Sequence, residues 1–279
     1  MAKKITPHIV IIALFAVIAL AFFYPVLQGK GIFQSDIAQY TGMAKERNDY
    51  RQTENKETYW TNSAFGGMPT YQLGAQYPND LVKQLDRTLR FLPRPADYLF
   101  LYFVGFYILL LVLKVDYKNA FLGAIAFGLS TYLIIILGAG HNSKAHAIAY
   151  FAPVLAGILM VFQRKYLWGG LLTAVALALE LSANHFQMTY YLLLLVLFLG
   201  AGLLYKAVKE KQLNDFGKAT AVLVGAVVVS VLANATLLLT TREYADWSTR
   251  SKSTLTLTPE GTPKKQSSGL SHEYITEYS

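Results

Sequence analysis

The polar segment at 138–146, GAGHNSKAH, separates two apolar runs and is rich in residues suited to binding an anion. His141, Asn142, Lys144 and His146 precede an expected helix, whose first N–H groups and positive dipole end favour a bound phosphate. Lys144 adds a positive charge at that place. His141 and His146 are five residues apart, off the i, i+4 spacing that puts two metal ligands on one helical face. The segment is therefore either a phosphate site or an ordinary capped loop.

Asp36 is the candidate for general-base chemistry. It belongs to the segment QSDIAQY, which follows the first apolar run closely, so its carboxylate is expected near a membrane surface. An ionised carboxylate there can take the proton of an acceptor hydroxyl within hydrogen-bond reach. Ser35 or Asp36 can equally cap a short helix running to Tyr50, because a carboxylate accepts hydrogen bonds from free backbone N–H groups. The two roles are compatible.

A second polar cluster joins two apolar runs at Glu180, Asn184, His185 and Gln187. An ionisable group at membrane depth is costly, and this makes Glu180 a candidate functional residue. The alternative is that Glu180 reaches the nearby surface or pairs with a neighbouring histidine. Arg242 begins the last polar segment, where it either clamps a phosphate or faces water. We expect all of these side chains to bind substrate.

Seven apolar runs must position these residues, and they predict an all-α polytopic membrane protein with about seven transmembrane helices. The expected spans are 9–27, 98–113, 120–137, 147–162, 167–181, 188–205 and 219–239, with a long outer loop at 28–97. Residues 1–241 then form a transmembrane module, and 242–279 an outer-face segment that we expect to be truncated. Asn234, inside the last run, is expected to form a hydrogen bond between helices.

Basic residues are concentrated in alternate connections between these runs, as the positive-inside rule expects of cytoplasmic ones. Ten basic and three acidic residues lie there, so these connections hold seven of the eight net positive charges. The N-terminus is therefore expected in the cytoplasm, with the first run as an uncleaved anchor. No basic stripe is left on the outer side for nucleic acid. The chain has no cysteine, which excludes disulfides and thiolate metal sites.

The long loop carries two further patterns. The turn-rich segment 59–71 has aromatic residues on both sides of a Gly-Gly pair, and it is expected either to anchor at the headgroup layer or to stack on sugar rings. Glu54 and Glu57 alternate with Arg51 and Lys56, which is typical of a solvated helix face.

The motifs QSDIAQY, WTNSAFGGMPTYQ, GAGHNSKAHAIAYFAP, SANHFQMTYY and TREYADWSTRSKSTLT resemble the N-terminal part of the bacterial YfhO family, whose members have the GT-C glycosyltransferase architecture. The resemblance covers essentially all 279 residues in family order. Members of the family are longer, so this chain resembles an N-terminal module, which is expected to be inactive alone.

The resemblance implies a multi-pass plasma-membrane enzyme with a polyprenyl-phosphate-linked sugar as donor and a cell-envelope glycan or lipid as acceptor. Asp36 matches the first-loop acid of GT-C enzymes, which implies a general base, and inversion is expected at the anomeric carbon. Some relatives use a divalent metal and others do not, so a metal cofactor stays open.

Two other classes of protein fit the same sequence. A transporter of lipid-linked sugars also presents polar groups at the outer surface, but usually has buried charges or broken helices at the midplane. A noncatalytic scaffold or assembly protein keeps the spans and needs no acid at Asp36. Retained function after Asp36→Ala would favour the scaffold.

Overall fold

The structure, a computed structural model, describes residues 2–248, so most of the expected outer-face segment at 242–279 lies outside the described residues. The described chain is mostly helical and divides into two compact units. Unit 1 comprises 1–42 and 77–234, and unit 2 comprises 43–76 and 235–279.

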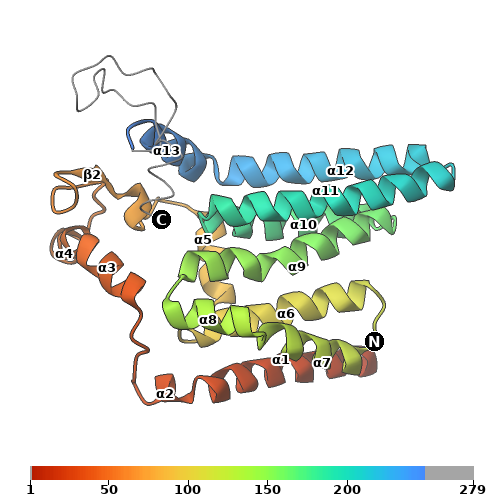
Figure 1. Cartoon of the computed structure of the whole chain (residues 1–279), viewed down its shortest axis with the longest axis horizontal. Helices are drawn as coiled ribbons and strands as arrows, with labels where there is room; N and C mark the ends of the chain where they lie inside the picture. The colour runs from red at the N-terminus through yellow and green to blue at the C-terminus, as the bar shows by residue number, and fades with distance from the viewer. Residues whose placement is uncertain (1, 249–279) are drawn as a thin grey trace, which may run out of the picture. The chain divides into compact units, whose positions relative to one another are not determined.

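Unit 1 is a bundle of long apolar helices (Figure 1). Its helices are α1 (Ala2–Phe22), α2 (Tyr24–Leu27), α3 (Ser35–Met43), α5 (Leu81–Leu89), α6 (Ala96–Val112), α7 (Tyr117–Gly128), α8 (Thr131–Ala139), α9 (Asn142–Phe162), α10 (Tyr166–Ser182), α11 (Phe186–Lys209) and α12 (Leu213–Ala233). Within residues 2–248, four segments are individually long and apolar enough to cross a membrane: 5–22 of α1, α9, α11 and α12. A fifth crossing results if α7 and α8 form one bent span, whereas α6 and α10 are shorter apolar helices of 17 residues each. The chain therefore has the helices of a membrane protein.

Three of the expected spans are interrupted, which corrects the sequence interpretation. The run at 9–27 breaks at Phe23, between the end of α1 at Phe22 and the start of α2 at Tyr24. The run at 120–137 breaks into α7 and α8, bent by 47°, because Ser130 takes an extended backbone with ψ of 144°. The run at 219–239 is not one helix, since α12 ends at Ala233 and Asn234 leaves the helical ladder. Asn234 Nδ2 donates to the carbonyl of Ala178 on α10 at 3.0 Å, which confirms the expected hydrogen bond between helices.

Helix α9 packs between α6 and α10 and is the most buried of the long helices (Figure 1). Small residues allow α9 and α10 to approach closely. A Cβ atom at Gly157 would lie 2.7 Å from the backbone nitrogen of Thr173, and one at Gly169 would lie 2.6 Å from that of Val161. Such close backbone contact is how helices associate in lipid, where apolar surface alone gives little driving force.

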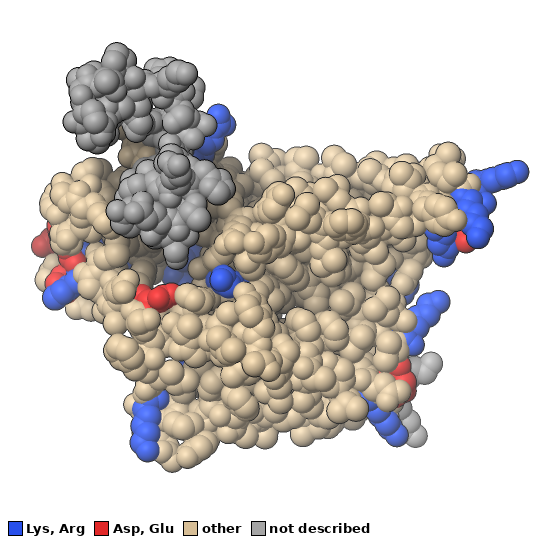
Figure 2. Space-filling model, viewed as in Figure 1, with Lys and Arg blue, Asp and Glu red and all other residues tan. Residues whose placement is uncertain are grey.

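The outward faces of the bundle are apolar, whereas charge is confined to its ends. Side chains such as Leu197, Phe198 and Leu232 are 59%, 77% and 67% exposed, and Figure 2 shows the sides of α11 and α12 without charged residues on this face. The N-terminus and the connections at 113–116, 163–165 and 210–212 lie together at one end, which we call the basic end (Figure 1). The connections at 28–34, 140–141 and 183–185 lie at the opposite end, which we call the loop end. Apolar sides with charge at the ends are compatible with a bundle that crosses a membrane.

Unit 2 is a small assembly of short elements. They are α4 (Lys45–Glu54), β1 (Trp60–Thr61), β2 (Met68–Pro69), the 3₁₀ helix η1 (Thr70–Leu73) and α13 (Ala235–Asp246). The two strands pair antiparallel, with Trp60 opposite Pro69. Glu46 fixes the hairpin to α4, because its Oε2 atom accepts hydrogen bonds from Thr61 Oγ1 and from the backbone nitrogens of Asn62 and Ser63, at 2.8 to 2.9 Å. The hydrogen bond from Thr61 is the main reason that the pKa of Glu46 is lowered.

The expectation that Glu54 and Glu57 form a solvated helix face holds for Glu54 and is wrong for Glu57. Glu54 is exposed on α4, whereas Glu57 follows that helix and its side chain is only 12% exposed. Its carboxylate lies 3.7 Å from Arg47 and 3.9 Å from Arg51, and it accepts a hydrogen bond from the backbone nitrogen of Gln76. Glu57 is therefore a structural anchor of the loop.

Candidate functional site

Asp36 and His141 form a pair at the loop end of unit 1, although 105 residues separate them in the chain. Asp36 Oδ2 lies 2.6 Å from His141 Nδ1. Asp36 stands in the first turn of α3, and His141 immediately precedes α9. Each side chain is 45% exposed, so the pair is accessible to a substrate. The sequence named both residues, and the structure brings them together.

Two neighbours explain why the pair forms. Gly140 ends α8 in the left-handed region, with φ of 89°, a conformation that glycine adopts without strain. A Cβ atom at Gly140 would lie 2.7 Å from the Cβ of Gln34, so only glycine admits this contact. Gln34 Nε2 in turn donates to the carbonyl of Leu137 at 2.5 Å. The chain before α3 is thereby held against the end of α8, and this places residue 36 beside residue 141.

The pair can carry out proton transfer in either of two ways. An ionised Asp36 can accept a proton from a substrate hydroxyl, with His141 holding the carboxylate in place through Nδ1. Alternatively, Asp36 fixes the tautomer of His141, whose Nε2 is then the accepting atom. In the structure, the Asp36 carboxylate is hydrogen-bonded to His141. This pairing does not require that Asp36 also caps α3.

The first turn of α9 continues the same surface. Asn142 and Lys144 are half-buried in that turn, and His141 at the N-cap position provides no side-chain cap. A helix of 21 residues thus begins with N–H groups directed toward the loop end, next to a lysine. Burial lowers the pKa of His185, and electrostatic interactions with Lys144 and His141 lower it further. His185 is accordingly neutral at neutral pH and belongs to the same electropositive neighbourhood.

The remaining residues of the second polar cluster differ in burial and in hydrogen-bond partners. Glu180 is fully buried, which overturns the interpretation that it reaches the surface. Its hydrogen-bond donor is Thr189, at 2.9 Å from Oε1, and not a histidine. Asn184 turns the chain between α10 and α11, with φ of 55°. Gln187 is exposed and donates to the hydroxyl of Tyr191 at 2.8 Å, one turn along α11.

Arg242 belongs to a different part of the protein. It is exposed on α13 in unit 2, whereas the other sequence-predicted site residues lie in unit 1. The cluster in unit 1 is therefore Asp36, His141, Asn142 and Lys144, with His185 in electrostatic contact.

A buried ionic network lies beside this cluster, and the sequence did not indicate it. Asp86 on α5 is 3% exposed, and its Oδ1 atom lies 2.5 Å from His146 Nε2 and 2.9 Å from the Tyr150 hydroxyl. Its Oδ2 atom accepts two hydrogen bonds from Arg90, at 2.6 and 2.9 Å. Arg90 also donates to Asp97 at 3.2 Å. His146, expected to bind substrate, is itself 7% exposed and points into the protein.

The network joins the long loop to the helix that carries the candidate site. Burial by itself raises the pKa of Asp86, but the hydrogen bonds and charges of His146 and Arg90 outweigh it and hold that pKa well below its usual range. Asp86 is thus ionised, and its contacts fix α5 against α9 at His146 and Tyr150, five and nine residues beyond His141. Because its groups are buried and paired with one another, the network is suited to hold the structure together and not to contact a substrate.

Comparison of the chain with protein-family models, with curated proteins and with solved structures finds no match. Among residues 2–248, no group of three or more His, Asp or Glu side chains is placed to hold a metal ion. Asp36 and His141 supply two donor groups, and they are already paired with each other. The described residues therefore do not make a complete metal site.

Proposed function

We propose that this chain is the membrane module of a glycosyltransferase that moves a sugar from a polyprenyl-phosphate carrier to an acceptor at the outer face of a bacterial plasma membrane. Its resemblance to the YfhO family and to the GT-C architecture supports this. The acceptor is a cell-envelope glycan or lipid. The observation that carries the proposal is the exposed Asp36–His141 pair beside Lys144, at the end of the bundle opposite the basic connections.

The proposed topology has seven crossings with a cytoplasmic N-terminus. Helices α6 and α10 have 17 residues, or about 26 Å at 1.5 Å per residue, close to a hydrocarbon core of about 30 Å. If α7 and α8 together make one bent crossing, the seven apolar runs alternate between the basic end and the loop end. The basic end then faces the cytoplasm by the positive-inside rule.

In the proposed reaction, an acceptor hydroxyl oxygen attacks the anomeric carbon of the donor sugar. The bond between that carbon and the phosphate oxygen breaks, and polyprenyl phosphate leaves with the bonding electrons. Asp36 takes the proton of the attacking hydroxyl, while His141 holds the carboxylate in position. Lys144 and the first N–H groups of α9 bind the phosphate, whose negative charge increases as the bond breaks. A single displacement inverts the anomeric carbon.

Replacing Asp36 with Asn tests the proposal in the full-length protein, in a deletion strain whose envelope glycans are compared with those of the wild type. Asn keeps the size of the side chain but does not accept a proton at neutral pH, so transfer should fall by about 10²- to 10⁴-fold. Asp80→Asn is the matched control, because Asp80 caps α5 by accepting from the backbone nitrogen of Lys83, and Asn caps about equally well. Transfer by Asp36→Asn within about twofold of the wild type would leave Asp36 as a helix cap and refute the base.

Transport of lipid-linked sugars is the second candidate, and two observations favour it. The break between α7 and α8 interrupts an apolar run, and Glu180 is a fully buried carboxyl group in an apolar helix. Broken helices and buried charges are typical of transporters. Movement of a labelled polyprenyl-phosphate sugar across vesicles that contain no acceptor distinguishes the two, because a transferase requires the acceptor and a transporter does not.

A further inference from the structure

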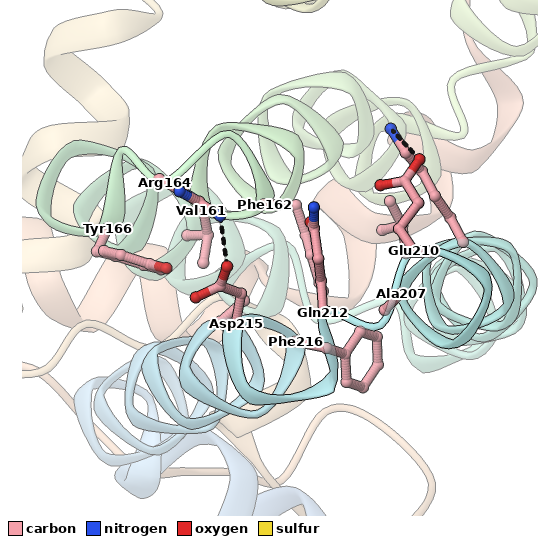
Figure 3. A pocket seen from close by; sticks show the side chains of 12 residues that line it. Val161, Phe162, Arg164, Tyr166, Ala207, Glu210, Gln212, Asp215 and Phe216 are labelled. Carbon is pink, nitrogen blue, oxygen red and sulfur yellow. Dashed lines mark hydrogen bonds and ion pairs between the residues drawn. The ribbon is translucent and has the colours of Figure 1, made fainter.

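The basic end of unit 1 contains a hollow that the proposed reaction does not use (Figure 3). It lies between the connection from α9 to α10 and the connection from α11 to α12, and its volume is about 100 Å³. The helices around it end or begin there, at Phe162, Tyr166, Lys209 and Leu213. In a bilayer-spanning bundle, this is the depth of the lipid headgroups.

Charged side chains of both signs border this hollow. Arg164 Nη2 lies 2.5 Å from Asp215 Oδ2, which joins the turn after α9 to the start of α12. Lys206 Nζ lies 4.0 Å from Glu210 Oε1, one turn apart near the end of α11. Figure 3 shows Arg164 and Asp215 on one side of the opening and Glu210 on the other. All four side chains are between 35% and 67% exposed, so each has open surface for a further partner.

This pattern selects among ligand types by charge. A purely anionic headgroup would meet Arg164 and Lys206, but also the carboxylates of Asp215 and Glu210. A purely cationic group would be attracted by these two carboxylates but repelled by Arg164 and Lys206. A zwitterionic headgroup satisfies both signs, because its phosphate can bind the guanidinium and ammonium groups while its own ammonium binds the carboxylates.

The inner wall of the hollow suits the beginning of an acyl chain. The rings of Phe162 and Phe216 lie 5.4 Å apart between their centres, and both line the hollow. Leu203, Ala207 and Ala219 complete an apolar wall. Pockets with basic residues between transmembrane helices bind lipid headgroups, and the apolar wall adds a contact for an acyl chain that a soluble phosphate does not have.

We propose that this hollow binds phosphatidylethanolamine, with its phosphate on Arg164 and Lys206 and its ammonium on Asp215 and Glu210. Phosphatidylcholine carries the same net charge, but its trimethylammonium group has no N–H to donate to the carboxylates. Phosphatidylglycerol presents a phosphate without any positive group. The site therefore prefers the ethanolamine headgroup over both.

Native mass spectrometry of the purified full chain with the three lipids, carrying identical acyl chains, measures this preference. We expect phosphatidylethanolamine to be retained about tenfold more tightly than either other lipid, a difference of about 1.4 kcal/mol. Arg164→Gln should weaken retention of phosphatidylethanolamine and of phosphatidylglycerol, since both lose a phosphate contact. Asp215→Asn should weaken phosphatidylethanolamine alone and improve phosphatidylglycerol, because it removes a repulsive carboxylate. Lys206→Gln repeats the first test on a weaker ion pair if Arg164→Gln does not fold.

The connection from α6 to α7 offers matched controls at the same end of the bundle. Lys114 and Arg164 share a φ of 63°, and Asp116 is a helix-start carboxylate like Asp215. Lys114→Gln and Asp116→Asn should therefore leave retention of all three lipids unchanged. Equal retention of the three lipids by the wild type, or equal effects of the control and hollow variants, would overturn the proposal. A preference for phosphatidylglycerol would overturn it too, in favour of a site for anionic lipid.

Discussion

Replacing Asp86 with Asn tests the role of the buried network most directly. The substitution keeps the shape of the side chain and removes its charge. Asp86 accepts hydrogen bonds from Arg90 and the Tyr150 hydroxyl and lies 2.5 Å from His146 Nε2. The carboxamide of Asn keeps one accepting atom, but its NH₂ group faces donors. The buried guanidinium of Arg90 then loses one of the carboxylates that balance its charge.

The expected loss of unfolding free energy follows from the burial of these groups. The side chains of Asp86 and Arg90 are 4% and 12% exposed, so solvent screens their interaction weakly. Removing one partner of a buried ion pair costs about 3–5 kcal/mol. Arg90 keeps Asp97 at 3.2 Å, which places the expected loss near the lower end, at about 3 kcal/mol.

Equilibrium unfolding of the full chain in mixed micelles, titrated with SDS and followed by far-ultraviolet circular dichroism, measures this loss. Asp80→Asn is the control on the same helix, and it should change stability by less than about 0.5 kcal/mol because Asn caps as well as Asp. In a double-mutant cycle with His146→Gln, the coupling energy should exceed about 0.5 kcal/mol. Equal effects of Asp86→Asn and Asp80→Asn would refute the reasoning, because they would show that the network adds nothing beyond the helix cap.

The same variant makes a prediction for acid stability. The folded-state pKa of Asp86 lies below its unfolded value, so the ionised group stabilises the fold fully above the unfolded pKa of about 3.9. That contribution is lost as the pH falls through this value toward the folded-state pKa. The stability difference between the wild type and Asp86→Asn should therefore be constant near pH 7 and shrink from about pH 4 downward. A difference that stays constant down to about pH 2 would contradict the depressed pKa.

Three further predictions test other parts of the molecule. Lys144→Ala should weaken binding of a polyprenyl-phosphate sugar by removing a charge-assisted contact, and unchanged affinity would remove Lys144 from the site. Because the chain has no cysteine, Asn55→Cys should react with an impermeant thiol reagent outside intact cells while Lys209→Cys should not, and the reverse pattern would invert the topology. Asn234→Ala should lower unfolding free energy by about 1 kcal/mol, through loss of the hydrogen bond to the Ala178 carbonyl, and a neutral result would show that the contact is dispensable.

The sequence predicted the helices well because hydrophobic length is a local property. All seven apolar runs are helical, although the breaks at Phe23, at Leu129–Ser130 and at Asn234 were not foreseen. Each break lies inside a stretch whose overall composition is apolar, and apolar composition does not show where the backbone changes direction. Asn234 was the polar exception in its run, and its expected hydrogen bond between helices is confirmed.

The candidate site was predictable in part. Asp36 stood out because it follows the first apolar run closely, and His141 because it lies in a short polar segment between two runs. The structure pairs them. Asp86 did not stand out, because it is one charged residue among many in the long loop at 28–97. The structure buries it and exposes Leu81, Leu85 and Leu89 of the same helix, by 73%, 41% and 36%. The buried carboxylate is tolerable because Arg90, His146 and Tyr150 pair with it.

The sequence by itself determined that this chain is mostly helical, with several helices apolar and long enough to cross a membrane. Lipid leaves a spanning segment no partner for its backbone except itself, so apolar length is enough to predict a helix. The tertiary structure alone decided which polar side chains meet. Asp86 reaches His146 across 60 residues of chain, and Asp36 reaches His141 across 105. Such contacts depend on how helices pack and where their ends turn, and no local pattern of residues encodes those distances.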